Sequence, residues 1–107
     1  MIFPMNAPMF DLLILSITAQ EDSYGYQLSQ KIKKVSNTKD STLYPILKRL
    51  QEQGYLTVYD QPFQGRNRRY YRITEAGRHH CQELADEWHA YQKAVEQIIQ
   101  GGYEDEP

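Results

Sequence analysis

The stretch YLTVYDQPFQGRNRRYYRI, residues 55–73, decides how this sequence is interpreted. Apolar and polar residues alternate in its first and last parts, which predicts two β-strands with one buried face each. We expect Tyr71 and Ile73 to point inward, and Arg68 and Arg72 to point outward. The residues that favour a turn between the strands are Pro62, Gly65 and Asn67. The stretch therefore predicts a hairpin with a loop of several residues, which must pack on other elements because an isolated hairpin is only marginally stable.

The positive charge of the chain gathers around this hairpin. Residues 31–78 hold eleven basic and four acidic residues, a net charge of +7, whereas the rest of the chain holds one basic and ten acidic residues, a net charge of −9. The total of −2 hides this separation. A basic middle segment with acidic flanks indicates a polyanionic partner for that segment, and clustered positive charge is a signature of nucleic-acid binding.

Two helical segments precede the basic region. Residues 8–20, PMFDLLILSITAQ, are apolar on more than one helical face, which in a small domain favours burial against both the core and a second subunit. Ser23 is expected to cap the next helix, residues 24–35. Gly25 lies on the apolar face of that helix, so we expect it to let another helix approach closely.

A third helix is predicted over residues 41–54, STLYPILKRLQEQG. Pro45 is expected in the first turn, since deeper in a helix it removes a hydrogen bond, and Gly54 is expected to end the helix. The face away from the apolar stripe suits a DNA major groove, although an ordinary solvated face is the alternative. The candidate DNA-binding residues, in this segment and in the hairpin, are Lys39, Ser41, Thr42, Tyr44, Lys48, Arg49, Arg66, Asn67, Arg68 and Arg69.

The last helix is predicted to run from a cap at Thr74 to about residue 99. Its apolar residues recur at spacings of three and four, a heptad seam that begins at Cys81. No predicted element covers this seam, so we expect a second copy of the chain to do so under two-fold symmetry. The expected dimer-interface residues are Leu13, Ile17, Leu84, Trp88, Tyr91, Val95 and Ile98.

These elements predict a mainly α fold with a small β-hairpin, namely a winged helix-turn-helix followed by a C-terminal dimerisation helix. The expected divisions are a DNA-binding domain over 1–73, the dimerisation helix over 74–100 and a flexible acidic tail over 101–107. A single cysteine fits a reducing compartment, and no stretch is long and apolar enough to span a bilayer. A cytoplasmic location is therefore expected.

The chain resembles the PadR family of bacterial transcriptional regulators. The matching segments are YGYQL (24–28), STLYPILKRLQEQGYL (41–56), RRYYRITEAG (68–77) and DEWHAY (86–91). The likeness covers residues 8–99, and the single C-terminal helix is similar to the subgroup with a short C-terminal helix.

This resemblance implies a homodimer that represses transcription at a palindromic operator and is released by a stress signal or a small molecule, often an aromatic one. It maps the family's DNA contacts onto Thr42, Tyr44 and Lys48, and onto the basic part of the hairpin from Arg66 to Arg69. In KDSTLY, Ser41 stands where the family usually has glycine, so it either adds a contact or caps the helix.

Trp88, the only tryptophan, lies in the middle of the seam. A packing anchor is its simplest role. Two-fold symmetry would also bring two indoles together, and paired aromatic rings can enclose a flat aromatic ligand, as a tryptophan at the matching place does in some members of the family that this chain resembles. Met9 and Asp11 are expected to line the same space, with the carboxylate favouring a cationic compound.

Other functions have weaker support in the sequence. His79, His80 and Cys81 point about 100° apart on a helix, so they cannot converge on one ion, and neither a metal site nor a cofactor is expected. No catalytic constellation is present, so an enzyme is not expected. The alternative from another class is a small helical dimeric adaptor that binds an acidic protein through its basic patch. DNA is favoured instead by the arginines of the hairpin beside a cationic helix. We expect these arginines to face the DNA backbone: Arg66, Arg68, Arg69 and Arg72.

Overall fold

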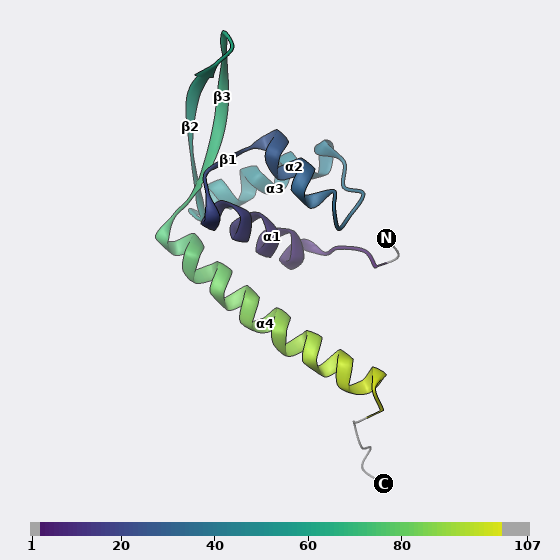
Figure 1. Cartoon of the computed structure of the whole chain (residues 1–107). Coiled ribbons are helices and arrows are strands. Elements are labelled where there is room, and N and C mark those ends of the chain that lie inside the picture. The colour runs from purple at the N-terminus through teal and green to yellow at the C-terminus, as the bar shows by residue number, and fades with distance from the viewer. Residues whose placement is uncertain (1–2, 102–107) are drawn as a thin grey trace.

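Four helices and three short strands make up the structure, a computed structural model that describes residues 3–101. The elements are α1 (Ala7–Gln20), β1 (Ser23–Tyr24), α2 (Gly25–Ile32), α3 (Asp40–Glu52), β2 (Leu56–Phe63), β3 (Arg66–Ile73) and α4 (Glu75–Ile99). The hairpin rises from one side of the α1–α3 bundle, and α4 extends from the other side (Figure 1). This arrangement confirms the predicted mainly α fold with a small β-hairpin. Apart from its first residue, the tail predicted for 101–107 lies outside the described residues.

The sheet contains a strand that the sequence did not suggest. Its order is β1-β3-β2, and Ser23 and Tyr24 of β1 pair with β3 in antiparallel register. The expectation that Ser23 caps α2 is therefore wrong: the capping position belongs to Tyr24, and the Ser23 hydroxyl donates to the carbonyl of Glu21 at 3.0 Å. The central strand β3 gains a partner on each side, which holds the hairpin to the helices.

The hairpin turn is tighter than predicted. The strands remain paired up to Phe63 and Arg66, so only Gln64 and Gly65 connect them, with φ of 51° and 79°. Positive φ at both central residues is the geometry that matches the twist of two-residue hairpins. The predicted loop of several residues is wrong because Pro62 is tolerated in the ladder, where β2 is an edge strand.

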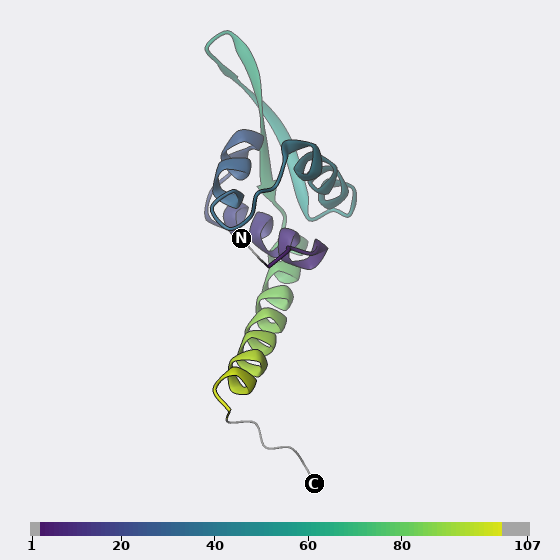
Figure 2. The ribbon, with the colours of Figure 1, turned by 90° about the vertical axis from the view of Figure 1, so that its right-hand side faces the viewer.

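The core lies where α1, α2, α3 and the lower part of the hairpin meet (Figure 2). Its completely buried large side chains are Ile14, Leu15, Leu28, Ile32, Leu43, Leu47, Leu50 and Leu56. Tyr71 and Ile73 point into this core from β3, as predicted. Phe10 and Leu12 of α1 are buried as well. Met9, Leu13 and Ile17 are only half-buried, so this helix presents further apolar surface outside the core.

The start of α3 differs from the prediction and its end agrees with it. The helix begins at Asp40, which places Pro45 in the second turn and not in the first. The proline is tolerated because it and Ser41, whose carbonyl loses its partner, are both exposed to water. Gly54, with φ of 83°, follows the last residues of the helix in the left-handed conformation and ends it, as expected.

Gly25 allows α3 to approach α2, which confirms the prediction for this residue. A β-carbon at Gly25 would lie 2.8 Å from the Tyr44 hydroxyl oxygen and 2.9 Å from a carbon of its ring. The glycine therefore determines where the Tyr44 ring can lie on the outer side of α3.

The helix α4 is capped by Thr74, whose hydroxyl accepts from the amide of Gly77 at 3.0 Å. Other residues of the same chain cover the beginning of its apolar seam. Cys81 and Leu84 pack against the core, and α4 contacts α1 there, which corrects the expectation that no element covers the seam. Farther along, the exposed fractions rise from 36% at Trp88 to 65% at Tyr91 and 68% at Ile98.

Candidate nucleic-acid interface

A groove lies between the hairpin and the helices that support it. Its volume is about 800 Å³. We call the hairpin, residues 56–73, the wing. The residues that line the groove include Tyr24, Tyr26 and Tyr44 from the helical side and Phe63, Arg66, Asn67, Arg68 and Arg69 from the wing. The fold thus brings Tyr44 together with the four basic or polar wing residues predicted to bind DNA.

Of the other predicted residues of α3, Lys39, Ser41 and Thr42 lie at or near its N-terminus, and Lys48 lies in its second half. Lys39 occupies the N-cap position, and Ser41, Thr42 and Lys48 are exposed on the helix. The Lys39 side chain makes no capping bond, and Ser41 lies inside the helix and not at the cap. An exposed helix N-terminus with hydroxyls and cations favours contacts with phosphate, because the helix dipole is positive there.

Arg49 differs from the other cations of α3. Its guanidinium donates to both carboxylate oxygens of Asp11, at 2.6 and 3.2 Å, and the Asp11 side chain is only 10% exposed. The hydrogen bond from Arg49 to Asp11 raises the pKa of Arg49. This pair joins α1 to α3. It corrects two expectations, since Arg49 does not present its charge on the outer face and Asp11 turns toward α3.

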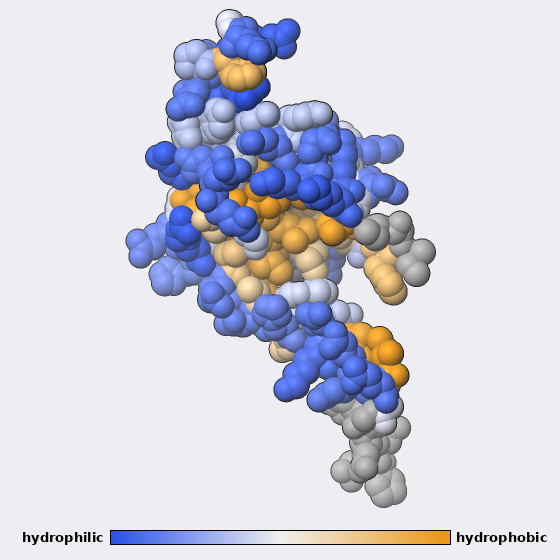
Figure 3. All heavy atoms as spheres, in the orientation of Figure 1, coloured by the Kyte–Doolittle hydropathy of each residue, from blue (hydrophilic) through white to orange (hydrophobic). Residues whose placement is uncertain are grey.

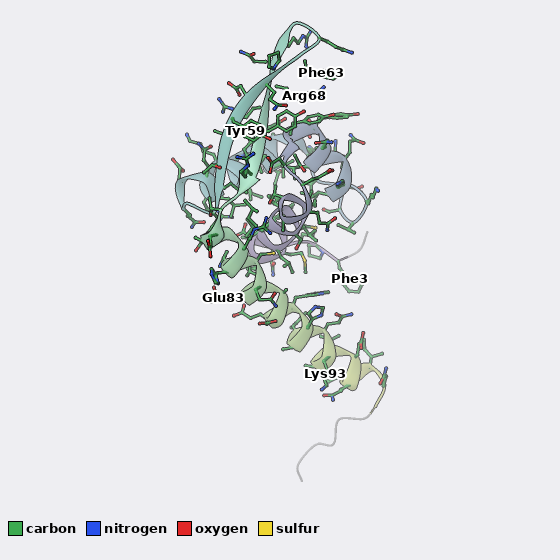
Figure 4. The ribbon with its side chains drawn as sticks, turned by 60° about the vertical axis from the view of Figure 1, so that its left-hand side comes forward. Phe3, Tyr59, Phe63, Arg68, Glu83 and Lys93 are labelled. Carbon is green, nitrogen blue, oxygen red and sulfur yellow. The ribbon has the colours of Figure 1, made fainter. Side chains whose placement is uncertain are left out.

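The wing arginines also divide into two groups. Arg72 binds Asp22 through two of its nitrogens, at 3.0 and 3.1 Å, and lies 4.9 Å from the centre of the Tyr59 ring. Arg69 is 3.7 Å from Asp60 on the neighbouring strand. The expectation that Arg72 faces the DNA backbone is therefore corrected: it anchors the base of the wing. Figure 4 shows Tyr59 near that base and Arg68 higher on the wing.

Asp22 holds the wing to the end of α1 and is the residue that the sequence analysis missed. It accepts a hydrogen bond from the Tyr59 hydroxyl at 2.7 Å as well as those from Arg72. The hydrogen bond from Tyr59, followed by the bond and charge of Arg72, holds the pKa of Asp22 below its ordinary value of 3.8. In the sequence Asp22 belongs to a short polar break, and nothing local there predicts a contact with the wing.

This anchor predicts a pH dependence of stability. A carboxylate with a lowered pKa stabilises the folded state while it is ionised, so its contribution is complete above pH 3.8 and is lost as the pH falls through the lower pKa of the folded state. We expect Asp22→Asn to reduce the free energy of unfolding by about 1 kcal/mol at neutral pH. Urea unfolding at a series of pH values should show this difference shrinking below about pH 4. A difference that stays constant into acid would contradict the role of the ionised carboxylate.

A second, smaller cavity lies between the start of α1 and the middle of α4. Its volume is about 280 Å³, and Met9, Leu12, Leu84, Glu87, Trp88 and Tyr91 are among the residues that line it. The structure thus brings Met9 and Trp88 together. Asp11 does not line this cavity, which corrects its assignment to the ligand site, because its carboxylate is bound to Arg49 on the other side of α1.

The histidines and the cysteine of α4 have structural surroundings. His80 stacks on Tyr55 with ring centres 4.4 Å apart, and the Cys81 sulfur lies 3.5 Å from the Ser16 hydroxyl. Within residues 3–101, no three side chains of the metal-binding types gather around one point. None of the helices in that range has the length and apolarity needed to cross a membrane.

The fold and the groove define a winged helix-turn-helix regulator, and comparison with known proteins identifies its family. Residues 14–83 match the Transcriptional regulator PadR-like family, and the chain belongs to it. The transcriptional regulator Rv3488 of Mycobacterium tuberculosis is 32% identical over 91 residues, which cover 84% of this chain and 82% of that protein.

Solved structures agree with this assignment. The protein smu.1704 of Streptococcus mutans is 43% identical, with a TM-score of 0.93 over 99% of this chain and 100% of that one. A PadR family transcription regulator from Clostridium difficile is 29% identical, with a TM-score of 0.77 over 84% of this chain and 97% of that one. The predicted family is therefore confirmed.

Proposed function

We propose that this PadR-like regulator acts in the cytoplasm as a homodimeric repressor that binds a palindromic operator and is released by a small aromatic effector. Residues 1–73 would form the DNA-binding part and α4 the dimerisation helix. The observation that carries the DNA-binding part is the groove, because Tyr44 of α3 and the wing arginines line the same space. In winged helix-turn-helix proteins a recognition helix enters the major groove, and the wing lies along the adjacent backbone.

Charge supports the assignment of roles within this interface. Arg49, Arg69 and Arg72 have carboxylate partners, whereas Lys48 and Arg66 extend into solvent from α3 and the wing. Paired arginines shape the wing and its support. The remaining exposed cations are suited to neutralise phosphates, which is the main source of affinity for DNA.

Apolar surface supports a dimer. Figure 3 shows apolar surface over α1 and a second apolar area close to the described end of α4. Tyr91, Ile98 and Ile99 are exposed by 65%, 68% and 76% on α4. Large apolar side chains are enriched at obligate subunit interfaces. An isologous dimer would cover the apolar surfaces of α1 and α4 at once. The recognition helices of such a dimer would be about 34 Å apart, one turn of DNA.

Selection of bound sequences from a random duplex pool tests this function. We expect enrichment of an inverted repeat with half-sites about one helical turn apart. A search upstream of the protein's own gene would then locate the operator, and a reporter placed behind it would measure repression. Failure to enrich any sequence, in a protein shown to be folded, would contradict a sequence-specific regulator.

The smaller cavity predicts where the effector binds. Because Trp88 is the only tryptophan of the chain and lines this cavity, its fluorescence reports ligand entry directly. We expect planar aromatic cations to quench it, since stacking on an indole contributes about 0.5–1.5 kcal/mol and Glu87 lies in the same lining. The same compounds should weaken operator binding.

Two variants test whether Trp88 binds a ligand or only packs against its neighbours. Met9→Leu preserves the apolar volume of the cavity and should retain quenching, whereas Glu87→Gln should selectively weaken the binding of cations. If none of the compounds quenches Trp88 and operator affinity is unchanged, Trp88 is a packing residue and the effector site lies elsewhere.

A further inference from the structure

The guanidinium of Arg68 lies between two aromatic rings. Its central carbon is 3.9 Å from the centre of the Tyr24 ring and 3.5 Å from the centre of the Phe63 ring. Arg68 belongs to the central strand β3, and the two rings come from the strands on either side of it, β1 and β2. Figure 4 shows Phe63 and Arg68 close together on the wing. The three-stranded order of the sheet is what makes this arrangement possible.

The charge of Arg68 is not matched by a carboxylate. Arg69 and Arg72, its neighbours along the strand, pair with Asp60 and Asp22. Within residues 3–101, no acidic side chain lies within ion-pair distance of Arg68. Aromatic rings stabilise a guanidinium through its faces and leave its in-plane N–H groups available for an anion.

The rings themselves are supported from the body of the protein. Tyr24 contacts Tyr70 edge-on with ring centres 5.6 Å apart, and Tyr70 stacks on Tyr59 at 5.4 Å. Tyr59 in turn donates its hydroxyl to Asp22. This row of contacts connects Arg68 to the end of α1. It restricts a long side chain that would otherwise lose much conformational freedom on binding.

We propose that Tyr24 and Phe63 are positioning residues that hold Arg68 for a backbone phosphate of duplex DNA in the groove between the wing and the helices. Arg68 and both rings line that groove. A planar guanidinium binds phosphate through two parallel N–H groups, so a fixed orientation improves the contact. This proposal rests on the proposed DNA-binding function and adds to it the residues that orient one phosphate contact.

A double-mutant cycle with a labelled duplex of mixed sequence tests the proposal, because a phosphate contact does not depend on sequence. Phe63→Leu should weaken binding about two- to fivefold, since one cation–π contact is lost. Phe63→Tyr, which keeps the ring, should bind like the wild type. Phe63→Leu should have no further effect when Arg68→Ala is already present. Tyr24→Leu should weaken binding as Phe63→Leu does, and Tyr24→Phe, which keeps the ring, should bind like the wild type.

Salt dependence and a neighbouring arginine provide the controls. Arg68→Ala should lower the slope of log affinity against log salt by about one, whereas Phe63→Leu should leave the slope unchanged because the charge remains. Arg66 pairs directly opposite Phe63, so Phe63→Leu should keep its full effect when Arg66→Ala is present. Circular dichroism would show that each variant is folded.

Two results would overturn the proposal in distinguishable ways. If the wild type binds the duplex and the losses from Phe63→Leu and Arg68→Ala add, Phe63 contacts DNA by itself and does not position Arg68. If the folded wild type does not bind the duplex even at low salt, the DNA-binding function fails, and the phosphate site fails with it.

Discussion

Replacing Tyr91 and Ile98 with aspartate is expected to convert the protein into folded monomers and to weaken operator binding by about a thousandfold. Both side chains are largely exposed in the single chain, so charges there leave the chain's own core intact. In a dimer the same positions would be buried, and unpaired carboxylates in an apolar interface are strongly unfavourable. A monomer reaches only one half-site, so most of the specific affinity disappears.

Sedimentation and operator titration measure the two parts of this prediction. Ala90→Asp with Gln97→Asp is the matched control, because both residues are exposed, lie about 100° around α4 from Tyr91 and Ile98, and add the same charge. The control should remain dimeric. Leu84 is a poorer site for the test, since it packs on the chain's own core. A Tyr91 and Ile98 double variant that sediments as a dimer would exclude this face of α4 from the interface.

Replacing Tyr44 or Lys48 with alanine is expected to weaken binding to the operator more than binding to mixed-sequence DNA. Each base-edge contact that is lost should reduce discrimination by about 1–3 kcal/mol. Both residues lie on the exposed face of α3, and Tyr44 also borders the groove. Fluorescence anisotropy with the two duplexes gives the comparison directly.

Gly25→Ala provides an independent test of the Tyr44 prediction. A β-carbon there would collide with the tip of the Tyr44 ring, which is half-exposed and can move away. We therefore expect little change in stability, within about 1 kcal/mol, but a loss of discrimination that resembles part of the Tyr44→Ala effect. Equal losses on both duplexes for Tyr44→Ala and Lys48→Ala would instead assign these residues to the DNA backbone.

The elements with strong local patterns were predicted well from the sequence. Alternation in residues 55–73 predicted the wing, and the inward direction of Tyr71 and Ile73 follows from the same period of two. Gly54 ends α3 and Thr74 begins α4 because helix ends depend on a few neighbouring residues. Errors of one or two residues arose where local rules were overridden by surroundings, as at Pro45.

The charged residues that the sequence analysis assigned incorrectly have partners far away in the chain. Arg49 was expected on the outer face of α3, and it binds Asp11, which lies 38 positions earlier. Arg72 was expected to face DNA, and it binds Asp22, 50 positions earlier. A count of charges along the chain shows where cations are concentrated, but it does not show which of them have a carboxylate partner.

The sequence by itself determined the class of fold, the family and the location of the basic surface, because these depend on periodicity, end signals and local composition. Only the tertiary structure decided which cations remain available to DNA and which hold the wing in place. It also showed that α1 covers the beginning of the α4 seam, and that Tyr24 and Phe63 enclose Arg68. The physical reason is that ion pairs and aromatic contacts act over a few ångströms in space, and folding sets those distances independently of separation along the chain.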